Sequence, residues 1–228
     1  DNYTINMIDT PGHVDFTYEV SRSLAACEGV LLIVDATQGI QAQTIANVNL
    51  AIQNNLTIIP IINKIDLPSA NPDSVKEQLE DILQIESDQA VLTSAKEGIG
   101  IEDVMKAVVR FIPAPVGDSE NPLKALLFDA WYDSYRGVIV LVRVVEGSLK
   151  IGTRIRFMAS GAEFDVEEIG TFTPAQKQIK SLQAGEVGYV IAAIKQMDQT
   201  KIGDTVTEAN RPAEEPLSGY KEVKPMVF

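Results

Sequence analysis

The first half of the chain alternates short apolar runs with longer segments whose apolar residues recur at helical spacing. The apolar runs, which we interpret as strands, are residues 5–8, 30–35, 56–62 and 90–93. The segments with one apolar face, which we interpret as helices, are residues 15–28, 42–54, 73–83 and 101–111. Strands that alternate with helices predict an α/β domain with a mostly parallel sheet over residues 1–112.

The pattern changes after residue 112. Residues 113–122 are rich in proline and polar turn formers and cannot continue a helix, so we expect them to link two domains. Beyond them, short β runs separated by glycines predict an all-β domain, a small antiparallel β-barrel over residues 123–208. Residues 209–228 are expected to form a linker and the start of a further domain.

Two residues carry local expectations of their own. Pro60 cannot donate a ladder hydrogen bond, so a frayed start or an irregular pairing is expected at its place in the strand 56–62. Asp73 can accept hydrogen bonds from the first turn of a helix, so we expect it to cap the helix that runs to residue 83.

Composition narrows the class of protein. The 228 residues suffice for two ordinary domains, each with its own core. The formal charge of −13 argues against a surface built only for nucleic acid, and no DNA partner is expected. The single cysteine, Cys27, excludes an internal disulfide and fits a reducing compartment. No apolar stretch approaches the length of a membrane span.

The first candidate for chemistry follows the apolar run 5–8 and comprises Asp9, Thr10, Pro11 and Gly12. A strand there would deliver Asp9 to the carboxyl edge of the sheet, where open α/β sheets bind ligands. A carboxylate at that edge can hold Mg²⁺ through water, and the N–H of Gly12 can approach a terminal phosphate closely. Taken alone, the motif could also be only a turn, because proline followed by glycine suits a type II turn.

The second candidate follows the apolar run 56–62 and comprises Asn63, Lys64, Ile65 and Asp66. The carboxylate of Asp66 can accept hydrogen bonds from both the ring N–H and the exocyclic amine of guanine, and adenine offers no such pair of donors. Asn63 can hold neighbouring loop backbone, and the aliphatic stem of Lys64 can lie along the purine face. Taken alone, the segment could also be a polar loop before a proline.

The third candidate follows the apolar run 90–93 and comprises Ser94, Ala95 and Lys96. Small residues allow a loop N–H to reach the carbonyl oxygen of guanine, at the position where adenine has an amine. Three elements in this order, each at the end of a predicted strand, are far more specific together than any one alone. The sequence therefore predicts a guanine nucleotide site.

Longer stretches around these motifs resemble the translational GTPases. The stretches that carry this resemblance are residues 9–16, 63–66, 94–96, 136–138 and 147–152. Within the superfamily, the LepA family is the most similar and the elongation factor G family is the nearest alternative. The stretches that favour LepA are residues 18–29, 172–176, 185–189 and 223–227. The match covers nearly the whole chain and implies a P-loop GTPase domain followed by the barrel of a translation factor.

The resemblance also implies functional roles. His13 would orient or activate the water that attacks the γ-phosphate of GTP, whereas a lone histidine without the motif would be read as a loop residue. Asp9 would hold Mg²⁺, which accompanies GTP or GDP in the family. The implied enzyme is a GTP hydrolase whose partner is the ribosome, through rRNA and ribosomal proteins. The implied setting is the cytoplasm, with peripheral association at the bacterial inner membrane as a further LepA feature.

The chain departs from the family at its beginning. No G-x-x-x-x-G-K-[ST] loop precedes Asp9, so the groups that grip the phosphates in the family are missing from these residues. We therefore expect an internal fragment with a truncated GTPase domain. Two hypotheses stay open: a piece of a ribosomal GTP hydrolase, and a non-catalytic module in which the barrel and a relic nucleotide fold only bind a partner.

Basic residues of the second half allow a further binding surface. They fall on adjacent predicted strands and turns and are Arg136, Arg143, Lys150, Arg154 and Arg156. Such a patch could meet ribosomal RNA phosphates. Charge on a solvated face of the barrel is the alternative interpretation.

The 228-residue polypeptide is expected to bind GTP weakly, because it lacks the groups that cradle the phosphates. Isothermal titration with GTP and Mg²⁺ checks this expectation. Submicromolar binding by the chain alone would contradict it.

Overall fold

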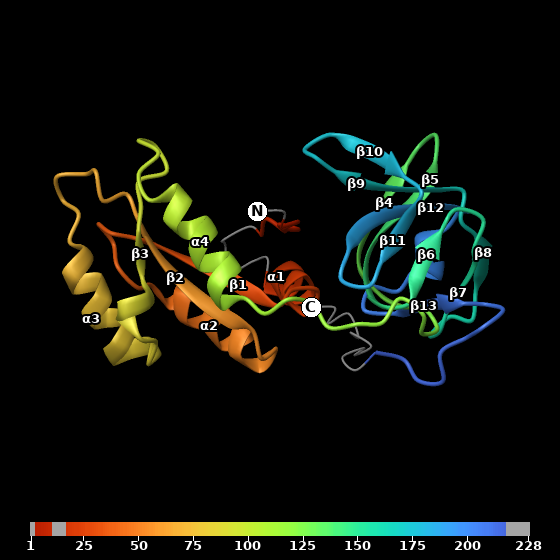
Figure 1. Cartoon of the computed structure of the whole chain (residues 1–228), viewed down its shortest axis with the longest axis horizontal. Coiled ribbons are helices and arrows are strands. Elements are labelled where there is room, and N and C mark those ends of the chain that lie inside the picture. Colours follow the sequence, from red (N-terminus) through yellow and green to blue (C-terminus); the bar gives the residue numbers. More distant parts are fainter. Residues whose placement is uncertain (1–2, 11–16, 218–228) are drawn as a thin grey trace, which may run out of the picture. The chain divides into compact units, whose positions relative to one another are not determined.

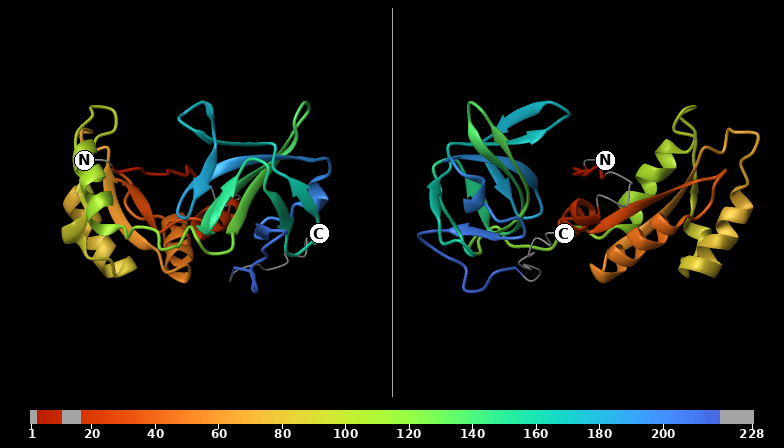
Figure 2. Two further views of the ribbon diagram at one scale, coloured as in Figure 1. Left: turned by 45° about the vertical axis from the view of Figure 1, so that its right-hand side comes forward. Right: turned by 180° about the vertical axis from the view of Figure 1, so that it is seen from behind.

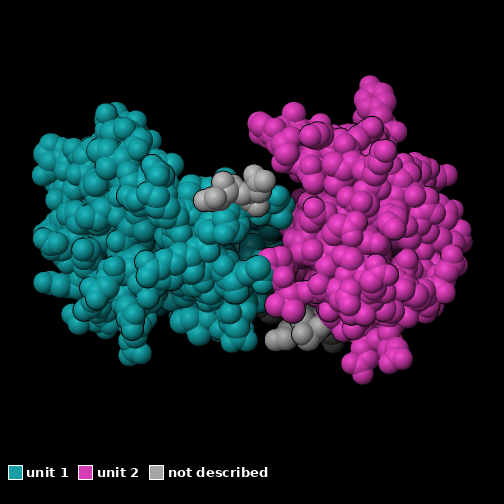
Figure 3. All heavy atoms as spheres, in the orientation of Figure 1, with its two compact units in different colours: residues 1–114 teal, residues 115–228 magenta. Residues whose placement is uncertain are grey.

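A computed structural model describes residues 3–10 and 17–217. The chain divides into two compact units, residues 1–114 and 115–228, and each is described by itself (Figure 3). Pro11, Gly12 and His13 lie outside the described residues, and so does the predicted start of a further domain at residues 218–228.

The first unit is a three-stranded parallel sheet flanked by helices, which confirms the predicted α/β class (Figure 1). Its elements in chain order are α1 (Thr17–Ala25), β1 (Gly29–Asp35), α2 (Ala42–Gln53), β2 (Thr57–Asn63), α3 (Pro72–Leu83), the 3-10 turn η2 (Ser87–Gln89), β3 (Val91–Leu92) and α4 (Ile101–Phe111). The strand order is β1-β2-β3, and β1 runs in continuous register along β2. That register sets Asp35 beside Asn63 at the carboxyl edge of the sheet.

Apolar side chains cover both faces of this sheet, as expected for parallel strands. On one face, Val34 and Ile62 pack with the buried residues of α2 and α3, among them Val48 and Leu79. On the other face, Ile59 and Ile61 pack with α4. The side chains of β2 therefore alternate between two packed faces, and Asn63 ends the strand at the carboxyl edge of the sheet. None of the described helices is both long and apolar enough to span a membrane.

The strand predicted at residues 5–8 is wrong. Residues 3–10 have no regular secondary structure, and Ile5 and Met7 are exposed. Strand β1 pairs with β2 on one side, and no strand among the described residues pairs with β1 on its other side. An apolar run becomes a strand only where a neighbour satisfies its backbone donors and acceptors, and this segment has no such pairing.

Two local predictions are also corrected. Pro60 sits within an unbroken register between β1 and β2, so no irregularity arises there. The short β3 pairs only with Ile61 and Ile62, so at Pro60 the strand has a described neighbour on one side alone. The cap of α3 is Asn71, whose Oδ1 accepts a hydrogen bond from Ser74 N at 3.2 Å, with proline in the first turn. Asp73 therefore lies inside the helix.

The second unit is an antiparallel sheet of eight strands in the order β10-β9-β12-β5-β4-β13-β7-β8, with a separate ribbon of β6 and β11. Its elements are β4 (Lys124–Asp133), β5 (Gly137–Glu146), β6 (Ser148–Lys150), β7 (Arg154–Phe157), β8 (Glu163–Asp165), β9 (Glu168–Phe172), β10 (Gln176–Ile179), β11 (Ser181–Gln183), β12 (Val187–Ile194), the turn η3 (Met197–Gln199) and β13 (Thr205–Glu208). The sheet curls until β8 approaches β12, which gives the predicted barrel-like form (Figure 2).

The barrel encloses one large apolar cluster. Its fully buried members include Leu127, Val140 and Phe157, which come from three different strands. On the outer side, the ring of Tyr189 lies over Gly170 of the neighbouring strand. A Cβ at residue 170 would come within 2.2 Å of that ring, so glycine is required there. The Tyr189 hydroxyl donates to Glu168 Oε1 at 2.8 Å, which fixes the ring.

Candidate functional site

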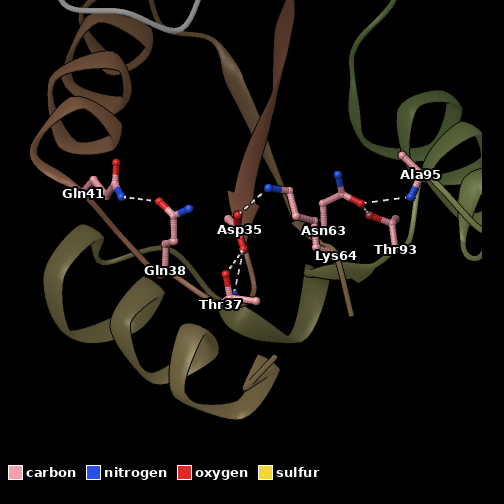
Figure 4. A network of polar contacts seen from close by, with 8 residues as sticks. All are labelled: Asp35, Thr37, Gln38, Gln41, Asn63, Lys64, Thr93 and Ala95. Atoms are coloured by element: carbon pink, nitrogen blue, oxygen red, sulfur yellow. Dashed lines mark hydrogen bonds and ion pairs between the residues drawn. The ribbon is translucent and has the colours of Figure 1, made fainter. Parts of the chain in front are cut away.

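The predicted base-reading elements meet at the carboxyl edge of the first unit's sheet. Asn63 ends β2, and its Oδ1 accepts hydrogen bonds from Ala95 N at 3.0 Å and from Thr93 Oγ1 at 3.2 Å (Figure 4). Thr93 N donates to Ile62 O at 2.8 Å, so the loop after β3 is tied to β2 by backbone as well. Two loops that lie 30 residues apart in sequence are therefore held together by one amide side chain.

The loop after β2 turns sharply at Lys64. Its φ of 66° lies in the left-handed region, which costs a non-glycine residue about 1 kcal/mol or more. The turn returns the chain to β3, because Ile65 N donates to Thr93 O at 3.2 Å. Ile65 itself packs against the core on one face of the sheet. Such strain persists where neighbouring contacts fix the backbone, and here it aims Lys64 and Asp66 out of the edge.

Asp66 stands beside the loop that begins with Ser94. A hydrogen bond from the Ser94 side chain holds the pKa of the Asp66 carboxyl below its usual value. Ser94 is completely buried and exchanges backbone hydrogen bonds with Ile99 at 3.1 and 3.0 Å, so it is a fixed donor. Asp66 is therefore ionised at neutral pH and half-exposed, as a carboxylate must be to accept two donors from a ligand.

Ala95 and Lys96 complete the predicted set and are both exposed. The Lys96 ammonium lies 3.4 Å from Glu97 Oε1, in a pair open to solvent. Since Asn63 already accepts from Ala95 N, the loop backbone has a defined position although its side chains face water.

A further group at this edge was missed by the sequence interpretation. Lys64 Nζ lies 2.7 Å from Asp35 Oδ2, and Asp35 Oδ1 accepts from Thr37 N at 2.8 Å and from Thr37 Oγ1 at 2.7 Å (Figure 4). The signal was available, because Asp35 ends a predicted strand at the same edge as Asn63.

The bond from Lys64 lowers the pKa of Asp35 from 3.8 to about 2, and the bonds from Thr37 add to this effect. Because the pKa of the folded state is lower than that of the unfolded chain, the pair stabilises the fold above pH 3.8. That contribution is lost as the pH falls toward about 2. At neutral pH the ion pair is fully formed.

Asp9 and Thr10 lie on a different part of the unit. Both line a cavity of about 670 Å³ that runs along β1 and that Asp35 also lines. Asn63, Asp66 and the loop 94–96 are not among the residues that line this cavity. Pro11, Gly12 and His13, the remaining predicted residues, fall outside the described part of the chain.

A magnesium ion at Asp9 is compatible with the donor set. Asp9 is exposed, and Mg²⁺ usually keeps several waters while taking one or two carboxylates and the phosphates of its ligand. Among residues 3–10 and 17–217, no three histidine, cysteine, aspartate or glutamate side chains gather as a metal site would require. A resident metal held by protein alone therefore has no support in this part of the chain.

Three of the five basic residues predicted to form a patch on the barrel are buried or paired with carboxylates, and the other two, Lys150 and Arg156, are exposed. Arg143 is buried at 7% exposure, so it cannot meet a ligand. Arg154 lies 3.0 Å from Glu163 and 3.2 Å from Asp165, and these two carboxylates offset its charge. Arg136 donates to Gln176 at 3.0 Å and lies 3.5 Å from Asp133, so it joins the β4–β5 hairpin to β10. For Arg136 and Arg154, the alternative interpretation of charge on a solvated face of the barrel, paired with neighbouring carboxylates, is therefore the better one.

Two family models match the chain, one in each compact unit. Residues 1–114 match the family described as the Elongation factor Tu GTP binding domain, and residues 137–207 match Elongation factor Tu domain 2. The chain belongs to the translational GTPase family. The resemblance inferred from the motifs is thereby confirmed for this translational GTPase chain.

Curated relatives align with the translational GTPase chain over all 228 residues. Elongation factor 4 of Geobacillus thermodenitrificans (strain NG80-2) is 59% identical, and the chain covers 37% of its length. Elongation factor 4 of Bacillus mycoides (strain KBAB4) is 58% identical, and that of Bacillus cereus (strain B4264) is 57% identical, with 38% covered in each case. The LepA resemblance is confirmed by these matches, and the chain spans just over a third of each relative.

Proposed function

We propose that this translational GTPase chain supplies the guanine-reading part of a GTP hydrolase that acts in translation on the ribosome. The observation that carries the proposal is the joined pair of loops at the sheet edge, with Asn63 bonded to Ala95 and an ionised Asp66 beside Ser94. The family match and the similarity to Elongation factor 4 support the same function.

The geometry explains how the site would select its base. The carboxylate of Asp66 accepts the two donors on one edge of guanine. Because Ser94 N and Ala95 N donate to Ile99 O and Asn63 Oδ1, the contact with the carbonyl oxygen of guanine is assigned to the backbone N–H of Lys96. With adenine, the acceptor ring nitrogen would face the Asp66 carboxylate, which is also an acceptor. Polar groups left without a hydrogen-bond partner in a site oppose binding strongly. Specificity for guanine thus follows from charge and hydrogen-bond polarity at two fixed loops.

The phosphate end of the site is assigned to the first motif. Asp9 would hold Mg²⁺ through water beside Thr10 and Pro11, and the ion would neutralise charge on the phosphates of GTP or GDP. Gly12 would contact the terminal phosphate, and His13 would hold the attacking water by a hydrogen bond. These roles rest on the family resemblance, together with the exposure of Asp9.

The partners and setting belong to the same proposal. GTP or GDP, rRNA and ribosomal proteins are the partners, and the cytoplasm is the compartment where they meet. Peripheral association with the inner membrane is carried by the LepA resemblance alone. The relatives' name, Elongation factor 4, supports translation as the process.

Base selection is tested with mononucleotides, which need no grip on further phosphates. GMP should shift the NMR signals of Asp66 and Ala95 with a Kd of about 1 mM, and AMP should not. Asp66→Asn should reverse the preference toward XMP, because an amide can donate to the second carbonyl oxygen of xanthine. Asp73→Asn, at an exposed position in α3, is the control. Equal binding of GMP and AMP by the unchanged chain would refute the proposed base reading.

Hydrolysis is tested in a chimera in which this chain replaces the matching 37% of the Geobacillus thermodenitrificans relative. Ribosomes should stimulate GTP hydrolysis by this chimera, and His13→Ala should lower the stimulated rate by about 100-fold or more, as loss of a general base or water-orienting group does. GTP binding should be unchanged. A His13→Ala chimera that hydrolyses GTP at the parent's rate would remove histidine from the proposed mechanism.

A further inference from the structure

The ion pair between Lys64 and Asp35 has no counterpart in the proposed base-reading chemistry. Lys64 Nζ lies 2.7 Å from Asp35 Oδ2, and the two residues come from neighbouring strand ends. The Asp35 side chain is 18% exposed and the Lys64 side chain 52%, so the carboxylate is the more enclosed partner. A long, half-exposed side chain is therefore anchored at its tip by a group that belongs to the sheet.

Asp35 is itself held from the opposite side. Its Oδ1 accepts from both the backbone N and the hydroxyl of Thr37, at 2.8 and 2.7 Å. The backbone around it is closed by a tight turn, since Gly39 N donates to Asp35 O at 2.9 Å with Gly39 at φ 68°. The two carboxylate oxygens thus have separate partners: one is fixed by Thr37, and the other is presented to Lys64.

The charge balance decides what Lys64 can offer a ligand. Its ammonium is neutralised by Asp35 at contact distance, so little free positive charge is left for a phosphate. The aliphatic stem, in contrast, is stretched between the left-handed backbone at residue 64 and the anchored tip. Fixing a four-carbon stem in advance removes the side-chain entropy that a ligand would otherwise lose when it packs there.

We propose that Asp35 and Thr37 are positioning residues that hold the Lys64 side chain as a preformed floor for the purine ring. The inference deepens and rests on the proposed guanine-reading function. The floor contacts the face of the base, whereas Asp66 and the loop after β3 contact its edge. Loss of the floor should weaken every purine that the site accepts by one common factor, and leave the choice among bases to Asp66.

The test compares the chain with its Asp35→Asn variant, using GMP and IMP as probes. Inosine lacks the exocyclic amine, so the ratio of GMP to IMP affinity reports on the edge, and the absolute affinities report on the floor. Asp35→Asn should weaken both nucleotides by the same factor of about two to five, the size expected for a partly exposed ion pair. Thr37→Val should have a smaller effect in the same direction, and Asp81→Asn on the exposed face of α3 none.

A spectroscopic readout separates positioning from general stability. The ammonium signal of Lys64 should be visible in the unchanged chain, because the ion pair slows its proton exchange, and should vanish in Asp35→Asn while the backbone signals of β1 and β2 stay in place. If Asp35→Asn binds GMP as well as or better than the unchanged chain, Lys64 does not act through Asp35 and the inference is overturned. If the unchanged chain binds GMP no better than AMP, the proposed function fails, and the inference falls with it.

Discussion

The amide side chain of Asn63 ties the loop after β2 to the loop after β3, and the arrangement of the candidate site depends on this link. The sheet brings the two strand ends to one edge, and backbone hydrogen bonds from Thr93 N to Ile62 O and from Ile65 N to Thr93 O join the loops there. The position of Ala95 relative to β2 depends on a side chain as well. One carboxamide oxygen that accepts from both Ala95 N and Thr93 Oγ1 supplies that position. The net value of two such bonds is about 1–3 kcal/mol, enough to decide between ordered and disordered loops.

The surrounding contacts build outward from that link. Lys64 takes a strained backbone conformation so that Ile65 can return to Thr93, and Asp66 then stands where the buried Ser94 can bond it. Asp35, fixed by Thr37, anchors the Lys64 side chain. The proposed base-reading residues are thus positioned by contacts within the first unit.

Much of this arrangement was readable from residue patterns, for identifiable reasons. Apolar periodicity predicted β1, β2 and all four helices, because burial on both faces of a parallel sheet constrains the sequence strongly. The same logic failed for residues 5–8, because a strand also needs a pairing partner, and periodicity cannot report one. The cap predicted at Asp73 was also wrong. Asn71, two residues earlier, accepts the hydrogen bond from the first turn, and a proline follows it at the start of the helix.

The site shows the same division. Asn63, Asp66 and Ser94 were predicted to lie at one edge because each follows an apolar run, and the sheet does bring these positions together. Asp35 and Thr37 were missed although Asp35 occupies an equivalent position, because their contribution is a contact between strands that depends on register. The predicted basic patch on the barrel was wrong for Arg154 and Arg143 for a related reason: residue type does not reveal that Arg154 is paired or that Arg143 is buried.

Amide hydrogen exchange at Ala95 tests the central claim most directly. If Asn63 holds the loop, Asn63→Ala should speed exchange of that amide by about five-fold, the effect of losing roughly 1 kcal/mol, while Asn54→Ala at the end of α2 should leave it unchanged. Equal protection of the Ala95 amide in the unchanged chain and in Asn63→Ala would contradict the account, because the loop would then be ordered without the link on which the site is said to depend.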